Sequence, residues 1–387
     1  MTQAARGFPT DEFRNRLARA QALMASADLA ALLLTTEPDV RYFSGYLTRF
    51  WESPTRPWFL IVPASGGPVA VIPSIGAALM SQTWVTDIRT WRSPDYDDDG
   101  VGILGETLRE ATGKGGRIGV PMGHETHLRM PLADWNRLVA ACPDRTFTDD
   151  QSIMHRLRAI KSEAEIDKIR AICAIGDRAF ARVPDIAHTG VPLADVFRRF
   201  QILGLQEGAD WVPYLAGASD QGGYSDVISP AGPEPLAAGD VLMLDTGMVR
   251  DGYFCDFDRN FSIGPPSAEV QSAHGRLIDA VDAAADIARP GATAADLFHA
   301  MDRLLTGGQG SDAGRLGHGL GMQLTEGLSL IPADQTVLEP GMVLTLEPGV
   351  ELGPGRIMVH EEDIVIRPDG PEFLSTRAGR GIAVLEG

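Results

Sequence analysis

The 387-residue chain is short of cysteine and has no long apolar run. Its three cysteines, Cys142, Cys173 and Cys255, are odd in number and widely spaced, which argues against a disulfide framework and for a reducing compartment. The longest apolar run, around residues 30–34, is far too short to span a bilayer, and the N-terminal string MTQAARGFPTDEFRNRL lacks an apolar signal core. We therefore expect a cytoplasmic protein without a membrane partner.

Positive charge is also scarce. The chain carries 34 Lys and Arg against 52 Asp and Glu, for a formal net charge of −18, and no segment gathers its basic residues into a dense cluster. Nucleic acid and anionic membranes attract basic surfaces, so neither is an expected partner. The length is comfortable for two domains that each bury a core of their own.

Hydrophobic patterning divides the chain near residues 148–153. Residues 11–25 have helical spacing, and the strings LAALLL, WFLIV, VAVIP and RIGVP are typical of buried strands, which predicts a small α/β domain over residues 1–152. A long amphipathic helix to about residue 182, with Lys161, Glu165 and Lys168 on its polar face, should open a second domain over residues 153–387. Further helices are expected at 193–207, 268–288 and 294–305. The fold class is α+β.

Two strings in the second domain resemble each other: GDVLMLDTG, which ends around Asp245, and GMVLTLEPG, which ends around Glu347. Each is a short apolar strand that leads to a carboxylate, and each is followed by a second acid, Asp256 or Glu362. A carboxylate at the edge of an apolar core is costly unless a cation receives it. The pattern therefore indicates a metal site.

Turn signals predict how these acids pair across hairpins. Asp251-Gly252 is a dipeptide that a two-residue hairpin turn prefers, and this turn would place Asp245 opposite Asp258, with Asp256 as a diagonal neighbour on the same face. In the second pair, the midpoint between Glu347 and Glu362 falls at Pro354-Gly355, another turn signal. Those two glutamates are therefore expected to face each other.

Between the hairpins lies the string GHGLG, in which His318 is flanked by glycines that let the backbone approach a neighbouring group closely. Imidazole is a common ligand beside carboxylates. We therefore add His318 as a fifth candidate metal ligand.

These strings resemble the creatinase, prolidase, aminopeptidase P and methionine aminopeptidase family, whose catalytic domain is called the pita-bread fold. The matching strings are LDTGMVRDGYFCDFDRNFSIG, GHGLG, TLEPG and EED, and residues 11–75 resemble the creatinase-type N-terminal domain. The resemblance implies that five residues hold two divalent metal ions, manganese, cobalt, zinc or iron, and that Asp256 and Glu362 bridge both ions. The five are Asp245, Asp256, His318, Glu347 and Glu362.

The resemblance also implies a chemistry. The function expected is hydrolysis of amide bonds in an Xaa-Pro dipeptide or peptide, in which a hydroxide held between the metals attacks the carbonyl. Glu347 is expected to be catalytic, because it can take the proton from the water and return it to the leaving nitrogen. A short peptide or another small molecule would be the substrate, and a homodimer the assembly.

Several positions depart from the family pattern. Thr325 stands where the peptidases carry a second histidine, and no histidine lies between His188 and His274, where a substrate-facing one is usual. His360 and Asp258 replace an arginine and a threonine. We expect His360 to handle protons, and Thr325, Asp258 and the family arginine Arg259 to contact substrate. An alternative is a hydrolase of small non-peptide C–N bonds, and a less expected one is a metal-free binding module.

The loop TRFWESPTRPW gathers Arg49, Trp51 and Arg56 in an otherwise acidic protein. In two-domain members of the family, the N-terminal domain of one subunit reaches toward the active site of its partner. The resemblance therefore implies that Trp51 is a substrate contact supplied across a dimer.

Overall fold

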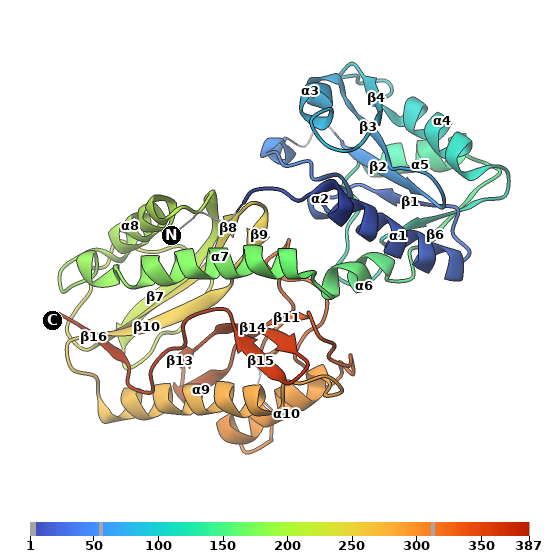
Figure 1. The fold of residues 1–387 in the computed structure, drawn as a ribbon. Helices are drawn as coiled ribbons and strands as arrows, with labels where there is room; N and C mark the ends of the chain where they lie inside the picture. Colours follow the sequence, from blue (N-terminus) through green and yellow to red (C-terminus); the bar gives the residue numbers. More distant parts are fainter. Residues whose placement is uncertain (1–4, 54–56, 311–313, 387) are drawn as a thin grey trace. The chain divides into compact units, whose positions relative to one another are not determined.

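The computed structural model describes residues 5–53, 57–310 and 314–386, and it divides the chain into two compact units (Figure 1). The N-terminal unit ends at Leu157 and the C-terminal unit begins at Arg158. In the described ranges, no helix combines the length and the apolar character needed to cross a membrane.

The N-terminal unit is built on a six-stranded sheet in the order β4-β3-β2-β1-β5-β6. Every residue of β1, β2 and β3 is buried, as in strands covered on both faces, and the strands expected from LAALLL, WFLIV, VAVIP and RIGVP are confirmed. The strands are β1 (Ala31–Leu34), β2 (Phe59–Pro63), β3 (Val69–Pro73), β4 (Asp87–Trp91), β5 (Arg117–Val120) and β6 (Thr146–Asp149). The helices are α1 (Thr10–Ser26), α2 (Glu37–Ser44), α3 (Ala77–Met80), α4 (Val101–Thr112) and α5 (Leu132–Ala141).

Two helices lead into the C-terminal unit: α6 (Ile153–Ala159), within which the division between the units falls, and α7 (Glu163–Phe180). The prediction of one helix to about residue 182 is wrong, because Ser162 caps α7. Its hydroxyl accepts a hydrogen bond from the Glu165 backbone N–H, and the Glu165 carboxylate accepts one from the Ser162 N–H. This reciprocal arrangement satisfies N–H groups that a helix start otherwise leaves without partners.

The expected polar face of this segment is also wrong, because Lys161, Glu165 and Lys168 are buried. Each has a polar partner elsewhere in the C-terminal unit. Lys161 pairs with Glu326 at 3.0 Å, Lys168 with Asp251, and Glu165 accepts from the Tyr253 hydroxyl. These contacts join the start of α7 to the first acid-bearing hairpin and to the loop that follows His318.

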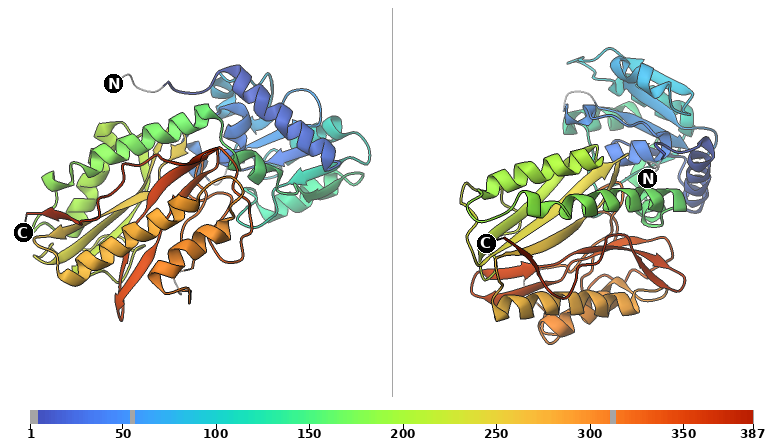
Figure 2. Two further views of the ribbon diagram at one scale, coloured as in Figure 1. Left: turned by 60° about the horizontal axis from the view of Figure 1, so that its bottom comes forward. Right: turned by 60° about the vertical axis from the view of Figure 1, so that its left-hand side comes forward.

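The remaining helices flank the strands of the C-terminal unit. They are α8 (Leu193–Glu207), α9 (Ala268–Ile287) and α10 (Ala294–Leu305), close to the predicted ranges. Helices α7 and α8 lie on one side of the strands, and α9 and α10 lie on the other (Figures 1 and 2). The strands are therefore a layered interior between two helix pairs, in the predicted α+β class.

Two sheets carry the acidic strings. The first has the order β16-β10-β8-β7, with the short strand β9 paired to β8. The second has the order β11-β14-β15, and β12 and β13 form a separate hairpin. The strands are β7 (Trp211–Gln221), β8 (Asp240–Arg250), β9 (Tyr253–Phe254), β10 (Phe257–Ile263), β11 (Val343–Leu346), β12 (Gly349–Gly353), β13 (Arg356–Val359), β14 (Glu362–Arg367), β15 (Gly370–Phe373) and β16 (Ala383–Leu385).

Candidate metal centre

The first acid-bearing hairpin has the predicted register. Asp251 and Gly252 both adopt positive φ, at 52° and 79°, as a two-residue hairpin turn of type I′ requires. Arg250 pairs with Tyr253 across the turn, and Asp245 lies opposite Asp258. The prediction for these two aspartates is confirmed.

The second hairpin is shifted by one residue. Its strands begin in one register, with Glu351 opposite Ile357, and a β-bulge then moves the pairing so that Gly353 lies opposite Arg356. Beyond the hairpin, β11 and β14 pair Leu346 with Glu362. The prediction that Glu347 faces Glu362 is therefore wrong, because continuing the observed register by one residue places Glu347 opposite Glu361. A one-residue shift exchanges the two faces of a strand.

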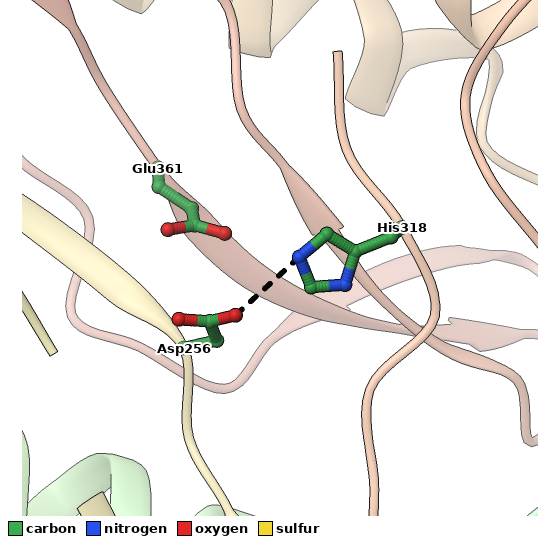
Figure 3. Close-up of side chains that lie close together, drawn as sticks. All are labelled: Asp256, His318 and Glu361. Atoms are coloured by element: carbon green, nitrogen blue, oxygen red, sulfur yellow. Dashed lines mark ion pairs between the residues drawn. The ribbon is translucent and has the colours of Figure 1, made fainter. Parts of the chain in front are cut away.

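The shifted register gives Glu361 a place in a compact ligand cluster with Asp256 and His318. One potential ligand atom from each residue lies within 4.8 Å of the others, and all three residues are buried. His318 Nε2 lies 3.4 Å from Asp256 Oδ2. Figure 3 shows the three side chains converging from separate segments of the chain.

The surroundings of His318 fix which nitrogen faces the cluster. Nδ1 lies 3.0 Å from the carbonyl oxygen of Gly319, an arrangement in which Nδ1–H donates and Nε2 keeps its lone pair. Burial, with the charge of Arg315 as a second cause, lowers the pKa of His318 to about 4. The ring is therefore neutral near pH 7, which is the form that binds a metal.

The glycines on either side of His318 allow the close approach that the sequence predicts. Gly317 has a φ of 138°, and a Cβ there would lie 2.3 Å from the carbonyl oxygen of Thr345. A Cβ on Gly319 would lie 2.0 Å from the carbonyl oxygen of Glu326. Side chains at either position would push His318 away from the acids.

Four carboxylates in this region lie close to one another, and the charge of Arg315 offsets burial at two of them only in part. Burial first, and then neighbouring carboxylates, raise the pKa values of Asp245, Asp256 and Glu361 well above their ordinary range. Burial also raises the pKa of Glu347, to about 7. Since like charges repel at short range, these acids cannot all ionise without a counter-ion.

Buried carboxylate oxygens without hydrogen-bond partners also indicate that these acids need a counter-ion. Among the described residues they include Asp245 Oδ1, Asp258 Oδ2 and Glu361 Oε1. Buried polar atoms normally have a partner, so the unpaired oxygens point to a missing cation. Carboxylate oxygens with one neutral imidazole suit divalent ions such as manganese, cobalt, iron or zinc. The residues present therefore fit the expected metals.

Glu362 lies outside this cluster. Its carboxylate accepts hydrogen bonds from Arg259 at 3.0 Å, from the Ala378 N–H at 2.8 Å and from the Ser375 hydroxyl, and it lies 3.2 Å from His360 Nε2. Burial opposes its ionisation, but Arg259 and His360 outweigh burial and lower the pKa of Glu362 to about 2. Glu362 thus already has its counter-charges, whereas Glu361 has none.

Arg259, Asp258 and His360, expected to contact substrate or to handle protons, join Glu362 in a buried polar network. His360 Nδ1 lies 3.0 Å from Asp258 Oδ1, and the two residues are 0% and 1% exposed. Burial opposes protonation of His360, but hydrogen bonds to Asp258 and Glu362 prevail and raise its pKa. Their observed contacts are with other protein groups.

Two residues that lie beside the acids, Tyr214 and Arg315, are not among those predicted from the sequence. The Tyr214 hydroxyl, on β7, donates to Asp245 Oδ2 at 3.1 Å. Arg315 donates to the hydroxyl of Thr325 at 3.1 Å, and its charge acts to lower the pKa values of Asp256 and Glu347. The position of Arg315, three residues before His318, was the available signal. No such signal pointed to Tyr214, because the sequence of β7 does not show in which register this strand pairs with β8.

Trp51 lies in the N-terminal unit, where it is buried. Its ring centroid is 5.9 Å from that of Trp58, and the Arg129 guanidinium lies over the ring at 5.2 Å. Arg56 of the same loop lies outside the described residues. A role for Trp51 in substrate binding stays a prediction.

Comparison with known proteins agrees with the architecture of both units. Residues 167–368 match the metallopeptidase family M24, and residues 16–160 match the creatinase/prolidase N-terminal domain. A protein named "Probable dipeptidase PepE" from Mycobacterium tuberculosis is 32% identical over 378 residues, which cover 93% of each chain.

Two solved structures resemble the whole chain. Dipeptidase PepE from Mycobacterium ulcerans has a TM-score of 0.84 at 27% identity and covers 98% of this chain and 100% of its own. Prolidase from Thermococcus sibiricus has a TM-score of 0.85 at 22% identity, covers 96% of this chain and 99% of its own, and supports the fold alone. The expected pita-bread fold with a creatinase-like N-terminal domain is confirmed. The chain belongs to the metallopeptidase family M24 and is a metallohydrolase.

Proposed function

We propose that this enzyme hydrolyses Xaa-Pro dipeptides or short Xaa-Pro peptides with two divalent metal ions. The proposed ligands are Asp245, Asp256, His318, Glu347 and Glu361, with Glu361 in place of Glu362. The observation that carries the proposal is the meeting of Asp256, His318 and Glu361 within 4.8 Å, beside two further buried acids. Asp256 and Glu361, which meet at His318, would hold the ions together with it.

The metals would supply Lewis-acid activation of water and of the substrate carbonyl. The protein supplies the proton transfer. Glu347, which lies beside Asp256, is the proposed acceptor of a proton from the attacking water, and it would return that proton to the leaving nitrogen. Tyr214 holds Asp245 in place through its hydroxyl. His360 is too enclosed by Asp258 and Glu362 for the proton transfer first expected of it.

Arg315 and Thr325 are the proposed contacts for the carboxylate of a dipeptide. Arg315 is a cation beside Glu347 and Asp256, and its bond to Thr325 holds it at the position where family members carry a histidine. A guanidinium recognises a carboxylate through paired N–H groups. The two dipeptidases among the similar proteins, at 32% and 27% identity, support peptide hydrolysis over hydrolysis of a small non-peptide amide.

Manganese is the metal we would test first, because carboxylate-rich sites with a single imidazole accept it. A homodimer follows from the family resemblance. A cytoplasmic location follows from the three cysteines, which are free and buried.

The proposal is tested by metal analysis and a substrate panel. Gently purified enzyme should hold about two divalent ions per chain, as a dinuclear hydrolase requires. Proline dipeptides, longer Xaa-Pro peptides and small amides are then compared with manganese-loaded enzyme. Protein that stays metal-free in excess manganese and cobalt would favour the binding module, and turnover confined to small amides would favour the other hydrolase. Thr325→His, which restores the family residue, should raise turnover of peptides only.

A further inference from the structure

Glu361 lies outside the assigned strands of the sheet. It falls between β13, which ends at Val359, and β14, which begins at Glu362. Side-chain direction in an extended segment follows the backbone, and a rotation of the peptide would carry the Glu361 carboxylate away from His318 and Asp256. The neighbours of Glu361 are held by pairing, His360 through its N–H to the Pro348 carbonyl and Glu362 opposite Leu346, so the groups that bond the backbone of Glu361 itself decide how closely its orientation is fixed.

Two consecutive residues of β10, Asp258 and Arg259, form hydrogen bonds with the backbone N–H and the carbonyl of Glu361. The Glu361 N–H donates to Asp258 Oδ1 at 2.9 Å. The Glu361 carbonyl accepts from Arg259 Nη1 at 3.1 Å. Since both main-chain polar groups of Glu361 are engaged, its side chain is directed toward the ligand cluster and that of Glu362 toward Arg259.

Asp258 is itself held in place by His360. The oxygen that receives the Glu361 N–H, Oδ1, is the one that lies 3.0 Å from His360 Nδ1. The other ring nitrogen, Nε2, lies 3.2 Å from Glu362 Oε1, so the ring is fixed at both ends. A site of this kind is as rigid as the groups that orient its ligands.

We propose that Asp258 is a positioning residue for the metal ligand Glu361, and that His360 fixes Asp258 in this role. The inference rests on the proposed metal site. It assigns to Asp258 a structural task toward the metals in place of substrate contact, consistent with an exposure of only 1%. It also explains why the two departures from the family pattern, at residues 258 and 360, occur together: they contact each other.

The test separates the hydrogen bond from the negative charge. Asp258→Asn keeps an acceptor oxygen for the Glu361 N–H, whereas Asp258→Ala and Asp258→Val remove it. Valine is β-branched and suits a strand, so it guards against a folding failure of the alanine variant. Metal-free protein is titrated with Mn²⁺ in a calorimeter, and the visible absorption spectrum of the Co²⁺ form reports ligand geometry independently of activity.

The alanine and valine variants should bind Mn²⁺ at least about tenfold more weakly, the usual effect of losing a partner that orients a ligand, and should show an altered Co²⁺ spectrum. In Asp258→Asn, the loss of Mn²⁺ affinity, expressed as the change in log Kd, should be less than half of the loss in the alanine variant. The matched control is Asp302→Ala, a buried aspartate on α10 that accepts from Thr306 and from the Gly310 N–H. It should lower the melting temperature without changing Mn²⁺ affinity.

Unchanged affinity and spectrum in Asp258→Ala or Asp258→Val would overturn the inference. So would an asparagine variant as impaired as the alanine variant, because charge would then carry the effect. Wild-type protein that binds no Mn²⁺ would sink the metal site and this inference with it, whereas variants that bind like wild type sink the inference alone.

Discussion

Glu361 and Glu362 are consecutive in the chain, yet their carboxylates lie in opposite electrostatic surroundings. Glu362 is buried among Arg259, His360 and two further donors, which bring its pKa down to about 2. The pKa of Glu361 is raised by burial and then by Asp256 and Glu347, and Glu361 Oε1 has no partner. The pair thus offers a matched test of which glutamate binds metal.

Glu361→Gln should lose most of its bound metal, because an amide oxygen is a weaker ligand and brings no negative charge. Glu362→Gln should keep about two ions per chain, as expected for a dinuclear site, and should instead lower the melting temperature, since it leaves Arg259 without its ion pair. Metal content by mass spectrometry after dialysis checks both. If only Glu362→Gln lost metal, Glu362 would be the ligand, as the sequence pattern predicts.

Metal affinity should rise with pH between about 5 and 7, because a protonated carboxylate cannot bind and the pKa of Glu347 is about 7. The same shift has a consequence for the metal-free protein. A carboxyl whose folded pKa lies above its ordinary value of 4.5 keeps its proton longer than in the unfolded chain, so stability falls as the pH rises from 4.5 to about 7. Calorimetry with Mn²⁺ in buffers of different ionisation enthalpy measures the released protons. A flat pH profile with no proton release would contradict this expectation.

Arg315→Ala should raise the KM for a dipeptide about tenfold or more, the effect of losing a charged hydrogen bond. The KM for the same dipeptide with an amidated C-terminus should change little, because the carboxylate is then absent. Arg276→Ala is the control, since Arg276 on α9 bonds only to a backbone carbonyl, that of Leu305. If both substrates are affected equally, Arg315 does not recognise the carboxylate.

Glu326→Gln should destabilise the protein without removing metal. Glu326 is buried with Arg158 and Lys161, and although burial opposes its ionisation, those two cations lower its pKa to about 2. Removing the charge takes away the carboxylate that neutralises these two buried cations, which costs about 3–5 kcal/mol. The wild-type contribution is present above pH 4.5 and is lost as the pH falls toward 2, so urea unfolding should show a smaller acid dependence in the variant. An unchanged unfolding midpoint at pH 7 would be the contrary result.

Local signals predicted the elements that have strong local causes. The turn at Asp251-Gly252 fixed the first hairpin, and with it the pairing of Asp245 and Asp258, because few dipeptides accept two positive φ angles. The break between α6 and α7 was also readable, since Ser162 and Glu165 form the Ser-x-x-Glu pattern of a capping box. The hydrophobic spacing continues through this break, and it therefore favours a single helix.

Other features depend on contacts distant in sequence. The bulge between Glu351 and Gly353 has no distinct signature in its residues, and it alone changes which glutamate faces Glu347. The burial of Lys161 and Lys168 likewise follows from partners far along the chain, Glu326 and Asp251. Helix periodicity places a residue on a side of the helix, but it does not show what packs there.

The bulge at the tip of the second hairpin lets its two arms differ in length by one residue. Leu352 is that extra residue, because Glu351 pairs with Ile357 and Gly353 pairs with Arg356. Deletion of Leu352 would leave both pairs, and with them Leu346 opposite Glu362, in the same register. Relatives that lack the extra residue can therefore keep the same ligand, and an alignment of the three consecutive acids is better anchored on β14 than on the turn.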